Sequence, residues 1–187
     1  MMLKLSEMKI EKEVFEPVPD FPKEIGFYLS GMDEVRGQLR KAVADLSDEE
    51  ISAKVLPSVH SIGQLILHIA EAEWWWIQCI VAERELDEEE AREKAHWDVL
   101  LDEDFASKNY SARFCIGEID KISRWTRESL KKFTGRDLER FFGWDRRDGT
   151  RMEKSLRWIL HHLIDHEAQH KGQILMLKRL LREGGTI

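Results

Sequence analysis

Histidine is concentrated in one short stretch of this sequence. Four of the seven histidines lie in residues 161–170, which read HHLIDHEAQH. Around them, apolar side chains recur at steps of three and four residues, as they do along one face of a buried helix. His166 and His170 occupy two steps of that apolar stripe, and imidazoles one turn apart on an inward face can bind one metal ion. The spacing therefore predicts two ligands of a metal site.

A third ligand is predicted upstream, at His68. This residue takes a step on a second apolar stripe, which runs from Leu65 to Cys79. In helical bundles, facing helices place their metal ligands toward one another in the core. Three imidazoles leave at least one coordination position open to water or substrate, which favours a reactive centre over a purely structural one. We therefore predict that His68, His166 and His170 bind a divalent metal ion.

Three further polar residues are candidates for catalysis. His162 lies one turn before His166 on the same side of the helix, so it either contributes to the metal pocket or packs as an ordinary helix residue. Glu71 and Glu167 are candidates for a general base or for a partner of a metal ligand, although such residues are commonly simple surface positions. Glu71, Glu167 and His162 thus complete the predicted site.

The remaining histidines are expected outside the site. His161 is placed to pair with Asp165 on the outer face of its helix. His60, in a loop, and His96, in an acidic segment, are expected to be structural or exposed.

Residues 166–170 also spell H-E-x-x-H, the motif of a class of zinc proteases in which the glutamate acts as general base. The extended form of that motif needs a glycine and a histidine where this chain has Gln173 and Met176, and no histidine follows His170. No strand is predicted that would build the usual protease scaffold. The protease interpretation is therefore rejected.

A carboxylate-bridged pair of metals is a second alternative, since such bundles use two Glu-x-x-His pairs. The chain contains Glu167–His170 and Glu93–His96. However, Glu93 lies in a run of charges without an apolar stripe, which is typical of a solvated face. A single metal ion remains the preferred interpretation.

Four long helices must position these residues. Apolar spacing and capping signals predict them at about 22–46, 61–85, 111–133 and 150–184, the last one starting with a capping box at Thr150 and Glu153. The connections are expected to hold short extra helices and no strand. We predict an all-α fold, a four-helix bundle forming one domain over residues 22–187, with residues 1–21 as an N-terminal extension.

Composition narrows the function classes. The net charge is −7 and the pI is about 5.6, which disfavours nonspecific binding to nucleic acid. No signal peptide and no apolar run of membrane-spanning length is evident, so we expect a cytoplasmic protein without a membrane partner. Cys79 and Cys115 lie in apolar helical patterns and are expected to be buried free thiols. Within the tryptophan triplet 74–76, Trp75 is expected near the metal site.

Two segments of the sequence resemble the DinB/YfiT-like superfamily of metal-binding four-helix bundles. They are SIGQLILHIAEAEWWW, which contains His68, and SLRWILHHLIDHEAQHKGQILMLKRLL, which contains His166 and His170. The resemblance spans roughly residues 22–183. It implies a three-histidine site for zinc or nickel at His68, His166 and His170, and an up-down-down-up bundle that often forms homodimers.

Some members of this superfamily are S-transferases that use the low-molecular-weight thiols bacillithiol or mycothiol. Metal coordination suits that chemistry because it deprotonates a thiol at neutral pH. The leading hypothesis is therefore a metal-dependent S-transferase that joins a thiol to a small electrophilic substrate. The alternatives are a metal-stabilised bundle that acts as a non-catalytic binding or stress-response module, and a metal-dependent hydrolase.

Overall fold

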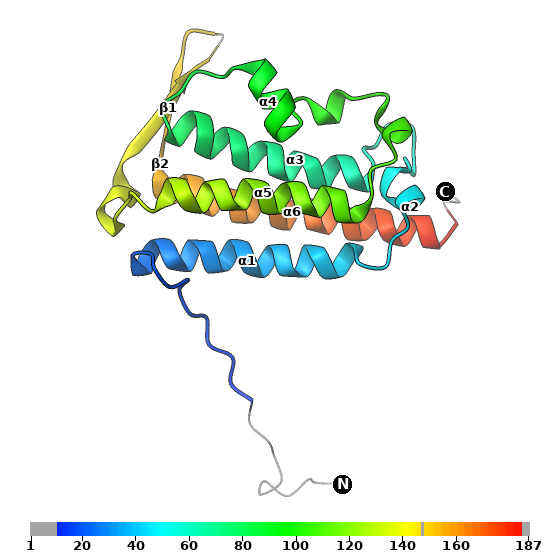
Figure 1. Cartoon of the computed structure of the whole chain (residues 1–187), viewed down its shortest axis with the longest axis horizontal. Coiled ribbons are helices and arrows are strands. Elements are labelled where there is room, and N and C mark those ends of the chain that lie inside the picture. The colour runs from blue at the N-terminus through cyan, green and yellow to red at the C-terminus, as the bar shows by residue number, and fades with distance from the viewer. Residues whose placement is uncertain (1–10, 147, 185–187) are drawn as a thin grey trace, which may run out of the picture.

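The computed structural model describes residues 11–146 and 148–184 and contains a four-helix bundle (Figure 1). The long helices are α1 (Lys23–Val43), α3 (Ile62–Trp74), α5 (Ala112–Leu130) and α6 (Leu156–Arg182). Helices α1 and α6 run in one direction and α3 and α5 in the other, so the order is up-down-down-up. Helix α3 packs on both α5 and α6, and α1 packs on α6. The predicted fold class is confirmed.

Serine caps fix where three of these helices begin. The Ser61 hydroxyl accepts the backbone N–H of Gln64 and the Gln64 side chain accepts the N–H of Ser61, which forms the capping box of α3. Ser111 caps α5 through the N–H of Phe114. Ser155 caps α6 through the N–H of Trp158. These bonds satisfy backbone donors that have no partner within the helix.

The absence of strands and the start of the last helix were predicted wrongly. Strands β1 (Phe141–Asp145) and β2 (Arg151–Ser155) form an antiparallel hairpin that precedes α6. The predicted cap, Thr150, instead binds Asp148 in the hairpin loop through both its hydroxyl and its N–H. The chain leaves the helical pattern at this point because β2 pairs with β1 along its whole length.

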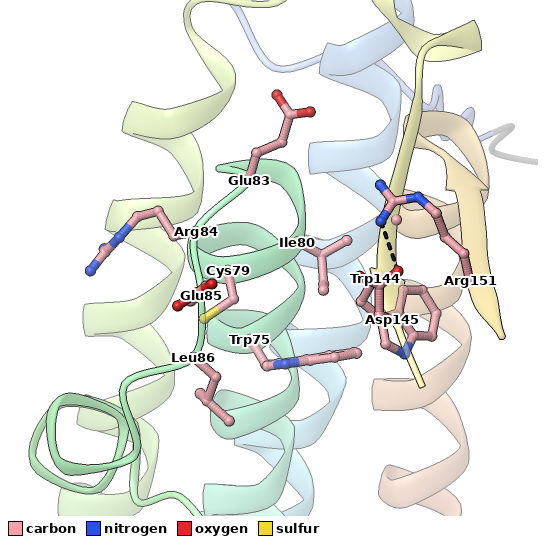
Figure 2. Close-up of a pocket in the computed structure, with 11 residues that line it drawn as sticks. Trp75, Cys79, Ile80, Glu83, Arg84, Glu85, Leu86, Trp144, Asp145 and Arg151 are labelled. Atoms are coloured by element: carbon pink, nitrogen blue, oxygen red, sulfur yellow. Dashed lines mark hydrogen bonds and ion pairs between the residues drawn. The ribbon is translucent and has the colours of Figure 1, made fainter. Parts of the chain in front are cut away.

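The tryptophan triplet lies where α3 widens into a π-helix, Trp75–Val81. Trp74 and Trp76 are both buried. Trp75 is half-buried and packs against Trp144 of the hairpin, with ring centroids 5.5 Å apart (Figure 2). Trp76, rather than Trp75, contacts a histidine of the site region, because its ring lies 5.5 Å from that of His162.

Apolar residues from all four long helices fill the core. Val35 is only half-buried, because Arg36 takes the inward position beside it, and Phe114 lies at the surface with 37% of its area exposed. The two cysteines, Cys79 and Cys115, are buried free thiols, as predicted.

Short elements fill the connections. They are the α-helices α2 (Asp48–Ser52) and α4 (Glu88–Ala95) and the 3-10 helices Val99–Leu101, Phe105–Lys108 and Gly135–Glu139. Helix α6 ends at Arg182, and Gly184 follows with a positive φ of 84°. No helix among the described residues has the length and apolar character needed to cross a bilayer.

Residues 15–18 of the predicted N-terminal extension contact α1. Phe15 stacks on Phe27, and the N–H of Val18 donates to the carbonyl of Gly26. A Cβ at Gly26 would lie 2.8 Å from the carbonyl oxygen of Val18, so glycine permits this close approach. Where the domain begins stays a prediction, and residues 1–10 lie outside the described part of the chain.

Candidate metal centre

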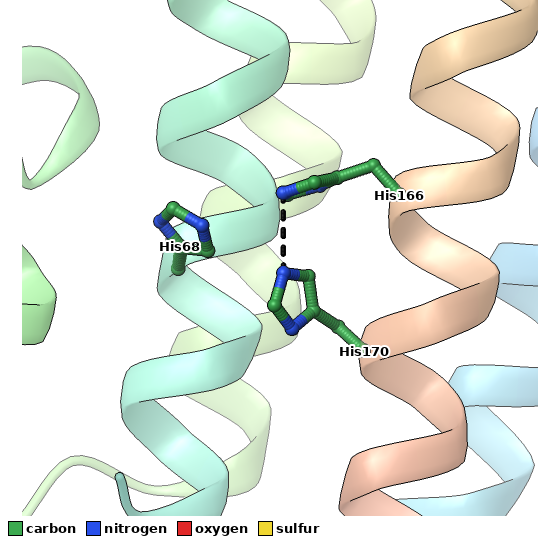
Figure 3. Close-up of side chains that lie close together, drawn as sticks. All are labelled: His68, His166 and His170. Carbon is green, nitrogen blue, oxygen red and sulfur yellow. Dashed lines mark hydrogen bonds between the residues drawn. The ribbon is translucent and has the colours of Figure 1, made fainter.

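Three histidines converge between α3 and α6. His68 projects from α3 toward His166 and His170 on α6 (Figure 3). One ring nitrogen from each lies within 4.8 Å of the others, and Nε2 of His166 is 3.1 Å from Nε2 of His170. The rings are half-buried, so the cluster is open to solvent on one side. These are the three residues that the two apolar stripes indicated.

Two of the rings are held by hydrogen bonds on their outer nitrogens. Nδ1 of His68 lies 2.7 Å from a Glu71 carboxylate oxygen, and the other oxygen of Glu71 accepts the N–H of Asp98. Nδ1 of His170 lies 2.9 Å from the Gln173 side-chain oxygen. A ring that donates through Nδ1 presents an unprotonated Nε2, and metal-binding histidines are commonly oriented in this way. No pattern in the sequence indicates this position for Gln173.

The surroundings favour the neutral form of the imidazoles on α6. Burial, with the neighbouring His170, His68 and His162, lowers the pKa of His166 to about 3. Burial also lowers the pKa of His170, against the hydrogen bond that its ring donates to Gln173, and burial lowers the pKa of His162. Neutral imidazole is the form that binds a metal ion.

The donor set fits a divalent ion such as zinc or nickel. Zinc binds imidazole nitrogen at about 2.05 Å, so two nitrogens on one tetrahedral ion lie about 3.3 Å apart. The 3.1 Å between His166 and His170 is close to that separation. Three nitrogen ligands leave at least one position for a water or a substrate atom.

His162 extends the row of histidines on α6. Its ring centroid is 5.8 Å from that of His166, and it stacks on Trp158 at 4.7 Å. The three-histidine group found among the described residues does not include it. His162 is therefore a neighbour of the site.

Glu167 does not lie among the histidines, where a catalytic role was predicted for it. Its side chain points into the bundle. Its carboxylate accepts two hydrogen bonds from Arg36 of α1, at 2.8 and 3.4 Å. Nη2 of Arg36, which makes the 2.8 Å bond, also donates to Glu73 of α3 at 2.7 Å. All three side chains are buried, and this ion cluster was not predicted.

The other histidines differ in how close they lie to the site. His161 is exposed, and its expected partner Asp165 accepts a hydrogen bond from Gln169. His96 ends α4 and pairs with Glu118 at 3.0 Å. His60 is half-buried beside the metal site, where burial, Lys54 and His68 lower its pKa.

A cavity of about 290 Å³ lies close to the three histidines, although none of them lines it. Gln173, the partner of His170, forms part of its wall. The other lining residues are Ser58, Val59, His60, Leu65, Met176 and Leu177. The lining is mainly apolar, which suits a small uncharged organic molecule more than an ion.

Comparison with known proteins supports this architecture. A family model described as mycothiol-S-transferase matches residues 29–183. A conserved protein from Enterococcus faecalis has a similar structure, with 17% identity, a TM-score of 0.62, and coverage of 83% of this chain and 95% of that one. A DinB-like protein from Bacillus cereus shows 21% identity, a TM-score of 0.59, and coverage of 84% and 93%.

At such identities the two solved structures show the fold alone. They confirm the DinB-like bundle that the two helical motifs predicted. No curated protein is similar enough to count as a match.

Proposed function

The chain belongs to the mycothiol S-transferase family, and we propose that it is a metal-dependent enzyme that transfers a low-molecular-weight thiol to a small electrophile. The observation that carries the proposal is the convergence of three imidazole nitrogens within 4.8 Å, open to solvent on one side. A binding module without chemistry would not require an accessible position beside the three nitrogens.

His68, His166 and His170 would hold the divalent ion, zinc or nickel. Bound there, the ion would lower the pKa of a coordinated thiol so that it reacts as a thiolate. Glu71 accepts the Nδ1 proton of His68 and is itself anchored by the N–H of Asp98, so it keeps Nε2 of His68 turned inward. Gln173 does the same for His170.

The reaction joins the thiol sulfur to an electrophilic carbon, displaces a leaving group with its electron pair, and releases the thiol proton. His162 is our candidate to receive that proton. Its ring lies next to His166, and no hydrogen bond to it is formed within the described residues. Glu71 and Glu167, the other two predicted candidates, are already engaged by His68 and Arg36. The apolar cavity of about 290 Å³ is the proposed place for the electrophile.

Metal analysis and a thiol panel test this proposal. The purified protein should carry one zinc or nickel ion per chain, and His166→Ala should lose it. The matched control is His161→Ala, since His161 lies on the same helix but faces solvent. With a chloro-nitroaromatic electrophile, the metal-loaded protein should form the thioether with mycothiol far faster than with bacillithiol or glutathione.

Three outcomes separate the alternatives. Stoichiometric metal without consumption of any thiol would favour the non-catalytic, metal-stabilised bundle. Metal-dependent cleavage of esters or amides without thiol consumption would favour a hydrolase. A native protein that binds no divalent metal would refute the site itself.

A further inference from the structure

A second cavity, of about 510 Å³, lies at the hairpin end of the bundle (Figure 2). One wall comes from the π-helix, through Trp75, Cys79 and Ile80, and from the segment 83–86 that follows it. The opposite wall is the hairpin, with Trp144, Asp145 and Arg151 among its residues. Its size is within the range of small-molecule sites. No role has been assigned to it so far.

Two indoles provide flat apolar surfaces in this cavity. The ring centroids of Trp75 and Trp144 lie 5.5 Å apart, with the ring planes at an angle of 79°. The buried Trp76 also packs against Trp144, with ring centroids 5.3 Å apart. An indole face is electron-rich, so it attracts the slightly positive C–H groups on one face of a sugar or cyclitol ring. The pair is therefore suited to a saturated ring with an apolar face.

Charged side chains at the rim suit hydroxyl groups better than a charged ligand. Three carboxylates and two guanidinium groups line the cavity: Glu83, Glu85, Asp145, Arg84 and Arg151. Both arginines are already paired, Arg151 with Asp145 at 3.0 Å and Arg84 with Glu90 at 2.7 Å. The lining therefore has no excess of cations to bind an anion, while its carboxylates can accept hydrogen bonds from hydroxyls.

The cysteine in the wall is suited to packing and not to reaction. Burial raises the pKa of Cys79 to about 11, with Glu90 adding to this and Arg84 opposing it. A protonated thiol is a poor nucleophile, so Cys79 contributes a soft apolar surface. The cavity thus has the features of a binding site without covalent chemistry.

The cavity is also within reach of the three histidines. Trp75 follows His68 by seven residues, which places it on the same face of the helix about 10 Å further along. On α6, the rings of His166, His162 and Trp158 form a continuous row leading to Trp76 and so to Trp144. A ligand with its sulfur at the histidines would need a body of this length to reach the cavity.

We propose that this cavity binds the neutral, hydroxyl-rich ring portion of the thiol substrate, a sugar or cyclitol packed on Trp75 and Trp144. The inference rests on the proposed function, because it assigns to this cavity the part of the same thiol that lies away from its sulfur. Glu85 is the proposed hydroxyl acceptor, since it lines the cavity and makes no hydrogen bond or ion pair within the described residues. The carboxylates of Glu83 and Asp145 are already paired with Arg140 and Arg151.

A sulfur-free probe tests the assignment. Binding of an N-acetylglucosaminyl-inositol is measured by titration calorimetry on the metal-loaded protein. Trp144→Ala should raise its Kd about tenfold, the effect of one lost aromatic contact. Phe141→Ala is the matched control, because Phe141 lies on the same strand, is 63% exposed and does not line the cavity. Glu85→Gln should also weaken binding of the probe. Because Glu85 lies outside the hairpin, this variant tests the cavity even if Trp144→Ala disturbs the hairpin.

The two proposals fail in different ways. The sulfur-free probe should bind His166→Ala as well as it binds the wild-type protein, because the cavity does not include the metal ligands. Absence of probe binding, or unchanged binding in both Trp144→Ala and Glu85→Gln, would overturn the cavity assignment even if thiol transfer is observed. Tighter binding of inorganic phosphate than of the probe would overturn the ligand class.

Discussion

Helices α3 and α6 are joined by two polar clusters of opposite character. In one, Arg36 bridges Glu73 and Glu167, and the arginine and both acids have side chains only 2% exposed. In the other, His68 faces His166 and His170, its side chain is 24% exposed, and the imidazole nitrogens face one another without a charged partner among them. The first cluster pairs its own charges, whereas the second brings together ring nitrogens of the kind that bind a cation.

We interpret the first as a structural cluster and the second as a candidate functional one. The Arg36 guanidinium is buried, which disfavours its charge, but Glu73 and Glu167 outweigh that effect and raise its pKa. At the histidines, burial and the neighbouring rings instead lower the pKa of His166 to about 3, so that its ring is neutral, and the three side chains are half-buried. The four predictions that follow test this division, from the largest expected effect to the smallest.

Removing the arginine should cause the greatest loss of stability. Arg36→Met leaves Glu73 and Glu167 buried without their counter-ion, and breaking a buried ion pair in this way costs about 3–5 kcal/mol. Urea denaturation measures the change in the free energy of unfolding.

The control replaces the whole cluster by apolar residues. Arg36→Met combined with Glu73→Leu and Glu167→Leu should recover most of the loss, since a buried ion cluster contributes little more than a well-packed apolar one. Both variants should bind metal with nearly wild-type affinity while they remain folded. A large loss of metal affinity in the folded triple variant would show that the ion cluster belongs to the metal site.

Changing Glu71 should affect the metal and leave the fold stable. Glu71→Gln removes the charge that accepts the Nδ1 proton of His68, and loss of such a partner lowers metal affinity about 10–100-fold. Competition with a metal-binding dye measures the affinity. Glu128→Gln is a matched control on the exposed surface of α5, and equal affinities in the two variants would contradict the role of Glu71.

A smaller effect is expected at Gln173, the hydrogen-bond partner of His170. Gln173→Leu removes a neutral hydrogen bond to His170, worth about 0.5–1.5 kcal/mol, so metal affinity should fall about two- to tenfold. The same dye competition measures it. A loss as large as that of Glu71→Gln would contradict the expectation that the charged partner Glu71 contributes more to metal affinity than the neutral partner Gln173.

At neutral pH the smallest effect is that of His166, whose titration changes the stability of the metal-free protein only below pH 6.5. His166 has a pKa of about 3 in the folded state against 6.5 ordinarily. Above pH 6.5 the ring is neutral in both states, so it makes no difference to stability. Between 6.5 and 3 the unfolded chain takes up a proton that the folded chain excludes, so stability falls as the pH is lowered.

Urea midpoints of the metal-free protein at a series of pH values measure this loss. His166→Ala should show a shallower decline. An equally steep decline in that variant would assign the proton uptake to other groups.

The histidine site could be predicted from sequence because it interrupts a regular pattern. His166 and His170 lie at steps where α6 otherwise carries apolar residues, and His68 does so on α3. The Arg36 cluster could not be found in that way. Its three members come from three helices, and each one alone resembles a surface residue. Only the packing of α1, α3 and α6 brings them together.

The hairpin was missed for a different reason. A strand with one buried face alternates apolar and polar residues, but β2 (RMEKS) has no fully buried residue and β1 (FFGWD) has one, Phe142. Thr150 and Glu153 also imitate a helix cap, while Ser155 provides the true one. Pairing between the strands, which local sequence does not reveal, decides the structure here.

The tryptophans around this hairpin give the protein an optical property. Trp75, Trp76, Trp144 and Trp158 form a chain of ring contacts with centroids 4.8–5.5 Å apart and rings steeply inclined to one another. Indoles at such separations couple their electronic transitions, and inclined coupled transitions give paired circular-dichroism bands of opposite sign. Because Trp144 comes from the hairpin and the others from two helices, the amplitude of that couplet reports directly how the hairpin is seated on the bundle.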